Sequence, residues 1–270
     1  MSILYARRED YTIDSRDVLN ALREDTALVS IMHVNNETGA VNDIYNISKM
    51  VKARNPETFF HSDGVQAFLK MPIYLANGEV DFYSMSAHKI NALKGTGALY
   101  IKNANKVKPL IVGGGQEGAL RSGTENTFGI ACFSAAVDEH LRNIDKEAKR
   151  IEFISKKLKS SLSNMEDVSL NSPPEDKCVP NIINVSVLGV HSETLLHALE
   201  ARGIYVSMGS ACSSRKNVGS RILKAQGISG DRLRGAIRIS LGISNTLAEA
   251  DMFLNVLEQE INTLRRFKKR

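Results

Sequence analysis

The chain has 270 residues, 43% of them hydrophobic, which is enough for one large domain or for two unequal domains with buried cores. Its net charge is +5, but five basic residues stand in the final stretch RRFKKR, and the rest of the chain has 30 basic and 30 acidic residues. This balance argues against a nucleic-acid-binding surface. The basic end suits the negative end of a helix dipole, with a docking site for an acidic partner as the alternative.

No apolar run approaches the roughly 20 residues of a membrane-spanning helix. The first residues, MSILYARREDYTID, include acidic residues where a signal peptide would continue its apolar segment, so we expect a cytosolic protein. Cys132, Cys178 and Cys212 lie far apart and form no CxxC pair. Neither a disulfide framework nor a zinc site is therefore indicated.

Short β-branched runs alternate with helical patterns in the first half of the chain, which is typical of a parallel or mixed sheet covered by helices. We predict a buried strand at 27–34 (ALVSIMHV) and a helix at 44–53 with Ile44, Ile47 and Val51 on one face. Further strands are predicted at 58–63, 80–86 and 97–102, the last able to pair antiparallel with a neighbour.

A long amphipathic pattern at 126–158 predicts one or two helices that bridge two domains. The stretch NSPPEDKCVPN (171–181) breaks this pattern with three prolines, and a smaller α/β unit follows. Its predicted strands are 182–188, 204–208 and 236–242, and its predicted helices are 192–203, 221–227 and 246–267. The sequence therefore predicts an α/β protein with domains at 1–145 and 146–270.

Polar side chains gather at four strand ends, where open α/β sheets place their working groups. They are Asn35 and Asn36, then Asp63 and Gln66, then Ser86, His88 and Lys89, and finally Arg238.

Lys89 and Asp63 each follow an apolar strand. One interpretation is a simple salt bridge. The other is pyridoxal phosphate, whose pyridinium nitrogen needs a carboxylate while an unprotonated lysine binds its aldehyde as a Schiff base. Ser86 and His88 beside the lysine suit a phosphate. The glycine-rich stretch GGGQEGALRSGTEN (113–126) leads into a helix whose N-terminus favours anions, although a structural turn explains such a cluster as well.

Six motifs in order resemble those of cysteine desulfurases of the NifS/IscS type in the class V aminotransferase family: SIMHVNNETG, HSDGVQA, SMSAHKINALKGTGALY, GGGQEGALRSGTEN, GSACSSRK and IRISLG. The resemblance extends from about Val29 onward. It implies an aspartate-aminotransferase-like fold, with an incomplete large cofactor domain at 1–145, mainly a parallel sheet with helices, and a small C-terminal domain with the cysteine loop at 146–270.

Full-length members of this family have a further segment before the ALVSIMHV strand. In those members it supplies a phosphate-binding turn and a histidine that stacks on the cofactor. We therefore expect Met1 to be an artificial or alternative start, and cofactor affinity and activity to be weakened in this chain.

The resemblance assigns a role to each candidate residue of the cofactor site. Lys89 corresponds to the Schiff-base lysine, Asp63 to the pyridinium partner and Gln66 to the residue that bonds the phenolic oxygen. Ser86 and His88 correspond to phosphate ligands.

Three further residues are implied to contact the cofactor or the substrate. Asn36 corresponds to the asparagine that contacts both the cofactor and the substrate carboxylate. Arg238 corresponds to the arginine that binds this carboxylate, for which its planar fork is suited. Thr124 corresponds to a threonine that reaches the phosphate of the neighbouring subunit, so the resemblance implies a homodimer.

The resemblance makes Cys212 the nucleophile that takes sulfur from L-cysteine as a persulfide and leaves L-alanine. Arg215 and Lys216 nearby would help to ionise its thiol. The sulfur would pass to an acceptor or iron-sulfur scaffold protein, for clusters, thio-cofactors or thiolated tRNA. No resident metal is expected, although Cys212 can transiently ligate a transferred cluster. The alternatives are another enzyme of the same family, such as a selenocysteine lyase or an aminotransferase, and a non-catalytic partner-binding fragment.

Overall fold

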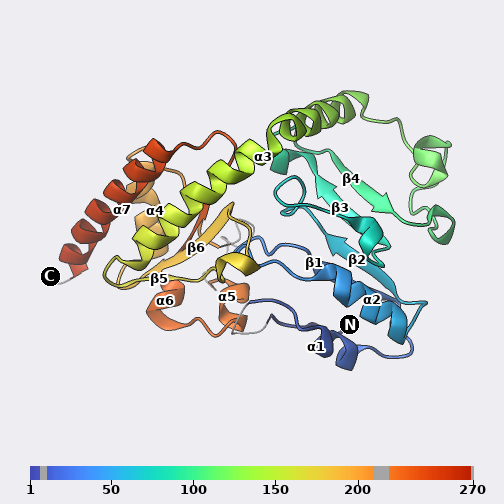
Figure 1. The fold of residues 1–270 in the computed structure, drawn as a ribbon, viewed down its shortest axis with the longest axis horizontal. Helices are drawn as coiled ribbons and strands as arrows, with labels where there is room; N and C mark the ends of the chain where they lie inside the picture. The colour runs from blue at the N-terminus through green and yellow to red at the C-terminus, as the bar shows by residue number, and fades with distance from the viewer. Residues whose placement is uncertain (7–10, 210–218, 269–270) are drawn as a thin grey trace. The chain divides into compact units, whose positions relative to one another are not determined.

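The computed structural model describes residues 1–6, 11–209 and 219–268, and these fall into two compact units (Figure 1). One unit comprises residues 15–33 and 42–144, and we call it the 42–144 unit. The other comprises residues 1–14, 34–41 and 145–270, and we call it the 145–270 unit. The chain therefore enters each unit more than once.

The 42–144 unit is built on a four-stranded mixed sheet of order β1-β2-β3-β4. Strands β1 and β2 pair in parallel, as do β2 and β3, whereas β4 runs antiparallel to β3. The four predicted strands are confirmed, and so is the antiparallel pairing of the last. The bounds are α1 Ser15–Ala21, β1 Leu28–Met32, α2 Ile44–Arg54, β2 Phe59–Asp63, β3 Phe82–Ser86 and β4 Gly97–Ile101.

Strand β1 is not buried as predicted. Leu28 is 54% exposed, and Ile31 is its only residue in the buried class. Within the described chain, β1 has one neighbour, β2, and stands at the edge of the sheet. An edge strand keeps part of its side-chain surface in solvent even when its residues are β-branched.

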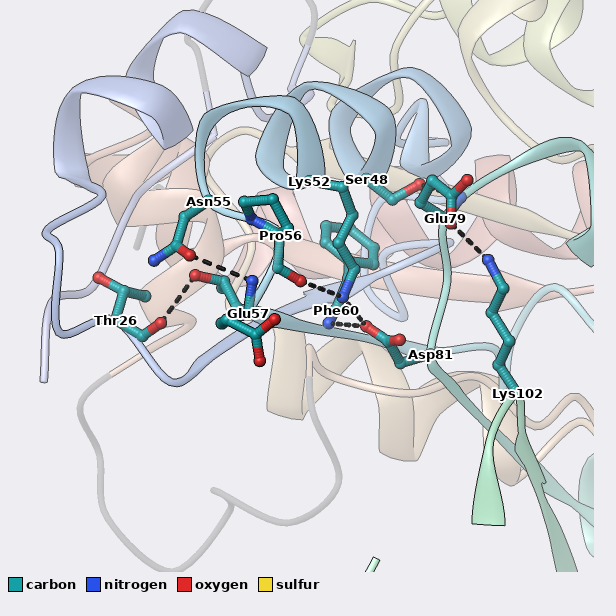
Figure 2. Close-up of polar contacts among 11 residues, drawn as sticks. Thr26, Ser48, Lys52, Asn55, Pro56, Glu57, Phe60, Glu79, Asp81 and Lys102 are labelled. Atoms are coloured by element: carbon teal, nitrogen blue, oxygen red, sulfur yellow. Dashed lines mark hydrogen bonds and ion pairs between the residues drawn. The ribbon is translucent and has the colours of Figure 1, made fainter. Parts of the chain in front are cut away.

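Asp43 caps the start of helix α2, and Asp81 connects this helix to the sheet. Asp81 Oδ2 accepts a hydrogen bond of 2.7 Å from the amide of Phe60 and pairs with Lys52 Nζ of α2 at 2.7 Å (Figure 2). The Lys52 and Asp81 side chains are 17% and 16% exposed, so this pair is shielded from solvent. The amide of Glu79 donates to Ser48 Oγ of the same helix at 3.0 Å. The predicted apolar face of α2, formed by Ile44, Ile47 and Val51, is buried.

The amphipathic pattern at 126–158 forms one helix, α3 (Thr127–Ser163), of 37 residues. Asn126 precedes it, and its Oδ1 accepts a hydrogen bond of 3.0 Å from the amide of Gly129. Residues of α3 up to 144 belong to the 42–144 unit and those from 145 to the other. A single helix thus runs from one unit into the other.

The 145–270 unit contains a three-stranded antiparallel sheet of order β5-β6-β7. Its elements are β5 Val168–Leu170, β6 Ile182–Val187, α4 Ser192–Glu200, α5 Arg221–Ala225, α6 Gly230–Arg234, β7 Ala236–Ser240 and α7 Leu247–Lys268. All six residues of β6 are buried, because this central strand has a neighbour on each side. The core joins the sheet to α3, α4 and α7 through Ile154, Leu158, Leu162, Ile183, Val185, Leu195, Leu199, Ile237, Phe253 and Leu257.

The predicted strand at 204–208 is wrong. Ser207 forms a single bridge with Arg238 of β7, through hydrogen bonds of 3.0 and 2.6 Å, and Tyr205 is 79% exposed. This stretch therefore pairs with β7 at one residue only, Ser207. Among the α-helices and strands of the described residues, α1, β5 and α6 were not predicted, and each is too short for a periodic pattern to show.

One residue of the basic end of α7, Arg265, contacts the chain's own backbone. Arg265 Nη2 donates hydrogen bonds of 3.2 Å to the carbonyls of Glu166 and Leu188. Throughout the residues that the structure describes, no helix combines the length and the apolar character that crossing a bilayer requires.

Gly64 follows β2 directly and lies against the ring of Tyr83 in β3. Tyr83 is fully buried, and a Cβ added to Gly64 would come within 2.0 Å of its ring. The amide of Gly64 also donates to the carbonyl of Ser84 at 2.9 Å, which holds the backbone in place. This position therefore requires glycine because of space.

Replacing Gly64 by alanine will destabilise the protein, because the new methyl group overlaps the Tyr83 ring. Overpacking a core costs about 1–3 kcal/mol, so urea titration should show a free energy of unfolding lower by at least about 1 kcal/mol. Gly115→Ala is the matched control, since a Cβ there meets nothing within 4 Å. Equal stability of the two variants would contradict this packing.

Candidate functional site

The sheet of the 42–144 unit brings most of the predicted cofactor residues to the carboxyl ends of two of its strands. Asp63 is the last residue of β2 and Ser86 the last of β3, and these strands are parallel neighbours with Asp63 opposite Ser84. His88 and Lys89 follow at once, in a short 3₁₀ helix over Ala87–Ile90. The carboxylate, hydroxyl, imidazole and amine thus all lie at the carboxyl ends of two adjacent strands.

The turn that carries the lysine is fixed by its backbone. The amide of Ala87 donates to the carbonyl of Thr96 at 3.1 Å, and Asn91 ends the turn in the left-handed conformation with φ 63°. A Cβ on Gly97 would lie 2.6 Å from the carbonyl oxygen of Met85, so only glycine allows β4 to pair this closely. These backbone contacts therefore fix the position of the Lys89 backbone.

The ammonium of Lys89 has no hydrogen bond or ion pair with any residue in the described ranges. The simple salt bridge with Asp63 is accordingly not formed. Beside it, Ser86 Oγ and His88 Nδ1 are hydrogen-bonded at 2.7 Å, and the His88 side chain is exposed. The structure thus presents an uncommitted amine next to a hydroxyl–imidazole pair.

Asp63 and Gln66 are both held by local contacts. Asp63 Oδ1 accepts a hydrogen bond of 2.9 Å from the amide of Val65. Gln66 is 8% exposed, and its Oε1 accepts from Lys70 Nζ at 2.9 Å. This contact assigns the amide oxygen to Lys70 and leaves the Gln66 N–H groups for another acceptor.

A row of hydrogen-bonded side chains runs across strands β1, β2 and β3. The sequence analysis did not predict it. His61 Nδ1 contacts Ser30 Oγ and its Nε2 contacts Ser84 Oγ, both at 2.8 Å. Burial lowers the pKa of His61, with Asp63 acting in the opposite direction. His61 and Asp63 are two residues apart in β2, and residues at this spacing point to the same face of a strand. This period-two signal could have predicted that the two lie together.

His33 supports the end of β2 from within the fold. Its amide donates to the carbonyl of Asp63 at 2.9 Å, and its Nδ1 contacts the Tyr83 hydroxyl at 2.8 Å. Burial lowers the pKa of His33 to about 4, partly opposed by Asp43, and burial raises the pKa of Tyr83. At neutral pH His33 is therefore an uncharged ring inside the unit.

The glycine-rich stretch uses its polar groups on itself. Ser122 Oγ donates to the carbonyl of Gly114 at 2.7 Å, and Arg121 Nη1 donates to the carbonyl of Ser122 at 2.9 Å. Thr124 is exposed and has no hydrogen-bond partner in the described part of the chain. These contacts favour a structural turn, and the contact of Thr124 with a second subunit stays a prediction.

The two predicted substrate residues belong to the 145–270 unit and are in direct contact there. Arg238 Nη1 donates to the backbone carbonyl of Asn36 at 2.9 Å, and its Nη2 lies 3.4 Å from Ser207 Oγ. The Nε atom of Arg238 is buried and has no partner among the described residues. Burial lowers the pKa of Arg238, while nearby Glu37 acts to raise it. Donor groups of this guanidinium thus remain for a ligand.

The predicted nucleophile Cys212 lies outside the described residues, as do Arg215 and Lys216. The other two cysteines are half-buried: Cys132 lies in α3, and Cys178 Sγ accepts a hydrogen bond from Lys159 Nζ at 2.9 Å.

Comparison with known proteins decides the family. A profile of the family described as aminotransferase class-V matches residues 4–253. The chain belongs to the class-V aminotransferase family. It is 38% identical over 259 residues to cysteine desulfurase IscS of Clostridium botulinum, a match that covers 95% of this chain and 65% of the relative. This class-V aminotransferase chain thus spans about two-thirds of the length of the curated relatives that it matches.

Solved structures agree with the family. A NifS-like protein, 35% identical, superposes with a TM-score of 0.88 over 97% of this chain and 68% of its own. SspA, solved in complex with cysteine, is 31% identical, with a TM-score of 0.73 over 91% of this chain and 67% of its own. These likenesses confirm the predicted fold class and the resemblance on which it was based.

Replacing His33 by glutamine will remove part of the pH dependence of stability. Between pH 6.5 and about 4 the unfolded chain binds a proton that buried His33 does not, so stability is complete above pH 6.5 and is lost as the pH falls. At pH 5 the loss from this group is about 2 kcal/mol. Urea titrations at pH 7 and pH 5 should show a smaller loss in His33→Gln than in the wild type.

The exposed histidine His191 provides the control. His191→Gln should keep the wild-type difference between the two pH values. If His33→Gln also keeps it, His33 is not the neutral buried group described here.

Proposed function

We propose that this chain acts as a pyridoxal 5′-phosphate-dependent cysteine desulfurase, which converts L-cysteine to L-alanine and keeps the sulfur as a persulfide on Cys212. One observation carries the proposal: Lys89, unpaired among the described residues, follows β3 directly in the turn Ala87–Ile90, and Asp63 ends the parallel neighbour β2 at the same end of the sheet. Membership of the class-V family and the similarity to IscS support it. Cys212 enters from the sequence, since its structure is not described.

The residues present fit the cofactor. Lys89 offers an amine to its aldehyde, Asp63 a carboxylate to its pyridinium nitrogen, and Gln66 amide N–H groups to its phenolic oxygen. Ser86 and His88 offer a hydroxyl and an imidazole to its phosphate. When bound, the cofactor supplies an electron sink for bonds that break at the substrate's α-carbon and beyond.

The chain's own groups then divide the work. Lys89, which would hold the aldehyde, would also move protons on the substrate with its amine. The Cys212 thiolate attacks the substrate sulfur, so that a carbon–sulfur bond breaks, a sulfur–sulfur bond forms and the carbon gains a proton. Atoms balance without an oxidant, because cysteine and a thiol give alanine and a persulfide.

Arg238 and Asn36 would orient the substrate through its carboxylate. A guanidinium has five N–H donors, and the contacts with Asn36 and Ser207 account for two of them. The remaining donors include the buried Nε, which gains a partner if a carboxylate binds. The pairing of Arg238 with Asn36 thus leaves other N–H donors of the guanidinium, including Nε, available.

The partners follow from the same proposal. L-Cysteine as substrate is supported by the likeness to SspA, which was solved with cysteine. A persulfide must be handed on, so an acceptor or iron-sulfur scaffold protein is required. We include in the proposal a cytosolic location and a homodimer in which Thr124 reaches the partner's cofactor.

Adding pyridoxal phosphate to the full chain should produce the visible absorbance of the lysine-bound cofactor, and Lys89→Ala should abolish it. Lys94→Ala is the matched control, because Lys94 is an exposed lysine in the same segment. A spectral change that persists in Lys89→Ala would show that another amine binds the aldehyde. No change even in the wild type would overturn cofactor binding for this chain.

Cys212→Ser should lose the formation of alanine from L-cysteine by at least about a hundredfold, because a hydroxyl does not accept the sulfur. Cys132→Ser, near the start of α3, should retain it. Alanine and sulfide are measured together. Unchanged alanine formation in Cys212→Ser would rule out the persulfide step and favour a lyase of the same family.

A further inference from the structure

The 145–270 unit contains a buried carboxylate that the proposed mechanism does not use. Glu37 is 3% exposed, although it lies in the polar turn NNETG directly after Asn36. Its Oε2 accepts a hydrogen bond from the hydroxyl of Ser220. A carboxylate removed from water in this way is costly unless its surroundings compensate, so its position needs a reason.

The backbone around Glu37 is fixed from two sides. Asn35 Oδ1 accepts hydrogen bonds from the amides of Glu37 and Thr38, at 2.9 and 3.0 Å. The carbonyl of Glu37 accepts from Asn184 Nδ2 of β6 at 3.1 Å, and Asn184 is itself fully buried. The turn that contains Asn36 is therefore built into the core of this unit.

This framework also fixes Arg238. Asn184 and Arg238 are cross-strand partners in β6 and β7, so the residue that holds the Glu37 carbonyl stands opposite the arginine. Arg238 in turn donates to the carbonyl of Asn36, next to Glu37. The two proposed substrate residues thus adjoin Glu37 in two ways, through the peptide bond between Asn36 and Glu37 and through the cross-strand pair of Asn184 with Arg238.

The carboxylate of Glu37 meets the chain on both sides of the segment that contains Cys212. Ser220, its hydrogen-bond donor, follows residues 210–218 and caps α5 by accepting from the amide of Leu223 at 3.0 Å. Gly209, which precedes that segment, lies so close that a Cβ on it would be 3.3 Å from Glu37 Oε2. In the sequence, Cys212 lies between these two contacts.

We propose that Glu37 is a positioning residue for the substrate carboxylate. Its backbone follows Asn36, whose carbonyl binds Arg238, and its buried carboxylate lies beside Gly209 and Ser220, the described residues that flank the Cys212 segment. This inference rests on the proposed function, since it assigns a purpose to a group next to the proposed carboxylate site. Glu37 does not touch the substrate in this proposal. It acts through Arg238 and Asn36.

The electrostatics of the set agree with a positioning role. Burial raises the pKa of Glu37, and the Ser220 hydroxyl and the charge of Arg238 oppose that rise. The opposed effects on Glu37 and Arg238 show that each group stabilises the charge of the other. Ser220 and Arg238 thus offset part of the cost of burying this acid.

Three variants test the inference on the full chain loaded with pyridoxal phosphate. Glu37→Ala removes the side chain and should raise KM for L-cysteine about tenfold while kcat stays within about twofold, since the carboxylate is bound equally before and during reaction. Glu37→Gln keeps an acceptor oxygen and should stay within about threefold of the wild-type KM. Ser220→Ala should raise KM in the same direction as Glu37→Ala.

A second readout does not depend on turnover. Phenylglyoxal modifies accessible arginines, and L-alanine should protect Arg238 from it in the wild type and in Glu37→Gln but much less in Glu37→Ala. Peptide mapping by mass spectrometry quantifies Arg238 modification. A purely structural role for Glu37 would lower the melting temperature without changing KM or this protection.

Two controls belong to the same unit. Glu193→Gln changes an exposed glutamate, and Ser229→Ala changes an exposed serine before α6 that forms no capping hydrogen bond. Both should leave KM unchanged. If Glu37→Ala fails to fold, Ser220→Ala still tests the contact, because it leaves Glu37 in place and removes its donor.

The outcomes separate the two proposals. A wild type that makes no alanine but shows Arg238 protection, lost in Glu37→Ala, would overturn the desulfurase proposal and support the positioning role. A wild type that makes alanine, with KM and protection unchanged in Glu37→Ala and Ser220→Ala, would overturn the positioning role alone. An equal rise in KM for Glu37→Gln and Glu37→Ala would also overturn it, because the retained oxygen would then not matter.

Discussion

The parallel pairing of β2 with β3 is the constraint on which the candidate cofactor site depends. It sets Asp63 opposite Ser84 and so brings the turn with Lys89 to the edge where the carboxylate lies. Gly64 and Tyr83 make this register specific, because a side chain at position 64 would enter the buried ring. A shift by one residue would turn Asp63 to the other face of the sheet.

The 145–270 unit contains polar side chains that are buried in its core and bonded to one another. Asn171 Nδ2 contacts Asn184 Oδ1 and Ser186 Oγ at 2.8 and 2.7 Å, and Arg232 Nε reaches Asn171 Oδ1 at 2.8 Å. These bonds satisfy buried amides that would otherwise be costly. The same network carries the Glu37 carbonyl, so the geometry at Asn36 inherits the rigidity of the core.

Much of the fold was predictable because its signals are local. The spacing of apolar residues within each segment predicts the strand at 58–63, the apolar face of α2 and the long helix α3. The stretch 204–208 failed because β-branched composition does not say whether a partner strand is available along its length. Likewise, the exposure of Leu28 depends on the place of β1 in the sheet, which composition does not encode.

The sequence by itself determined the family, since six ordered motifs mark it, and it predicted the chemistry from Lys89 and Asp63 at neighbouring strand ends. Only the tertiary structure decided which groups are committed: Lys89 is unpaired among the described residues, and Gln66 gives its oxygen to Lys70. Only the structure, too, joined Glu37 to Ser220, 183 positions away. Such contacts depend on burial and on pairs distant in the chain, and neither leaves a periodic signal in the sequence.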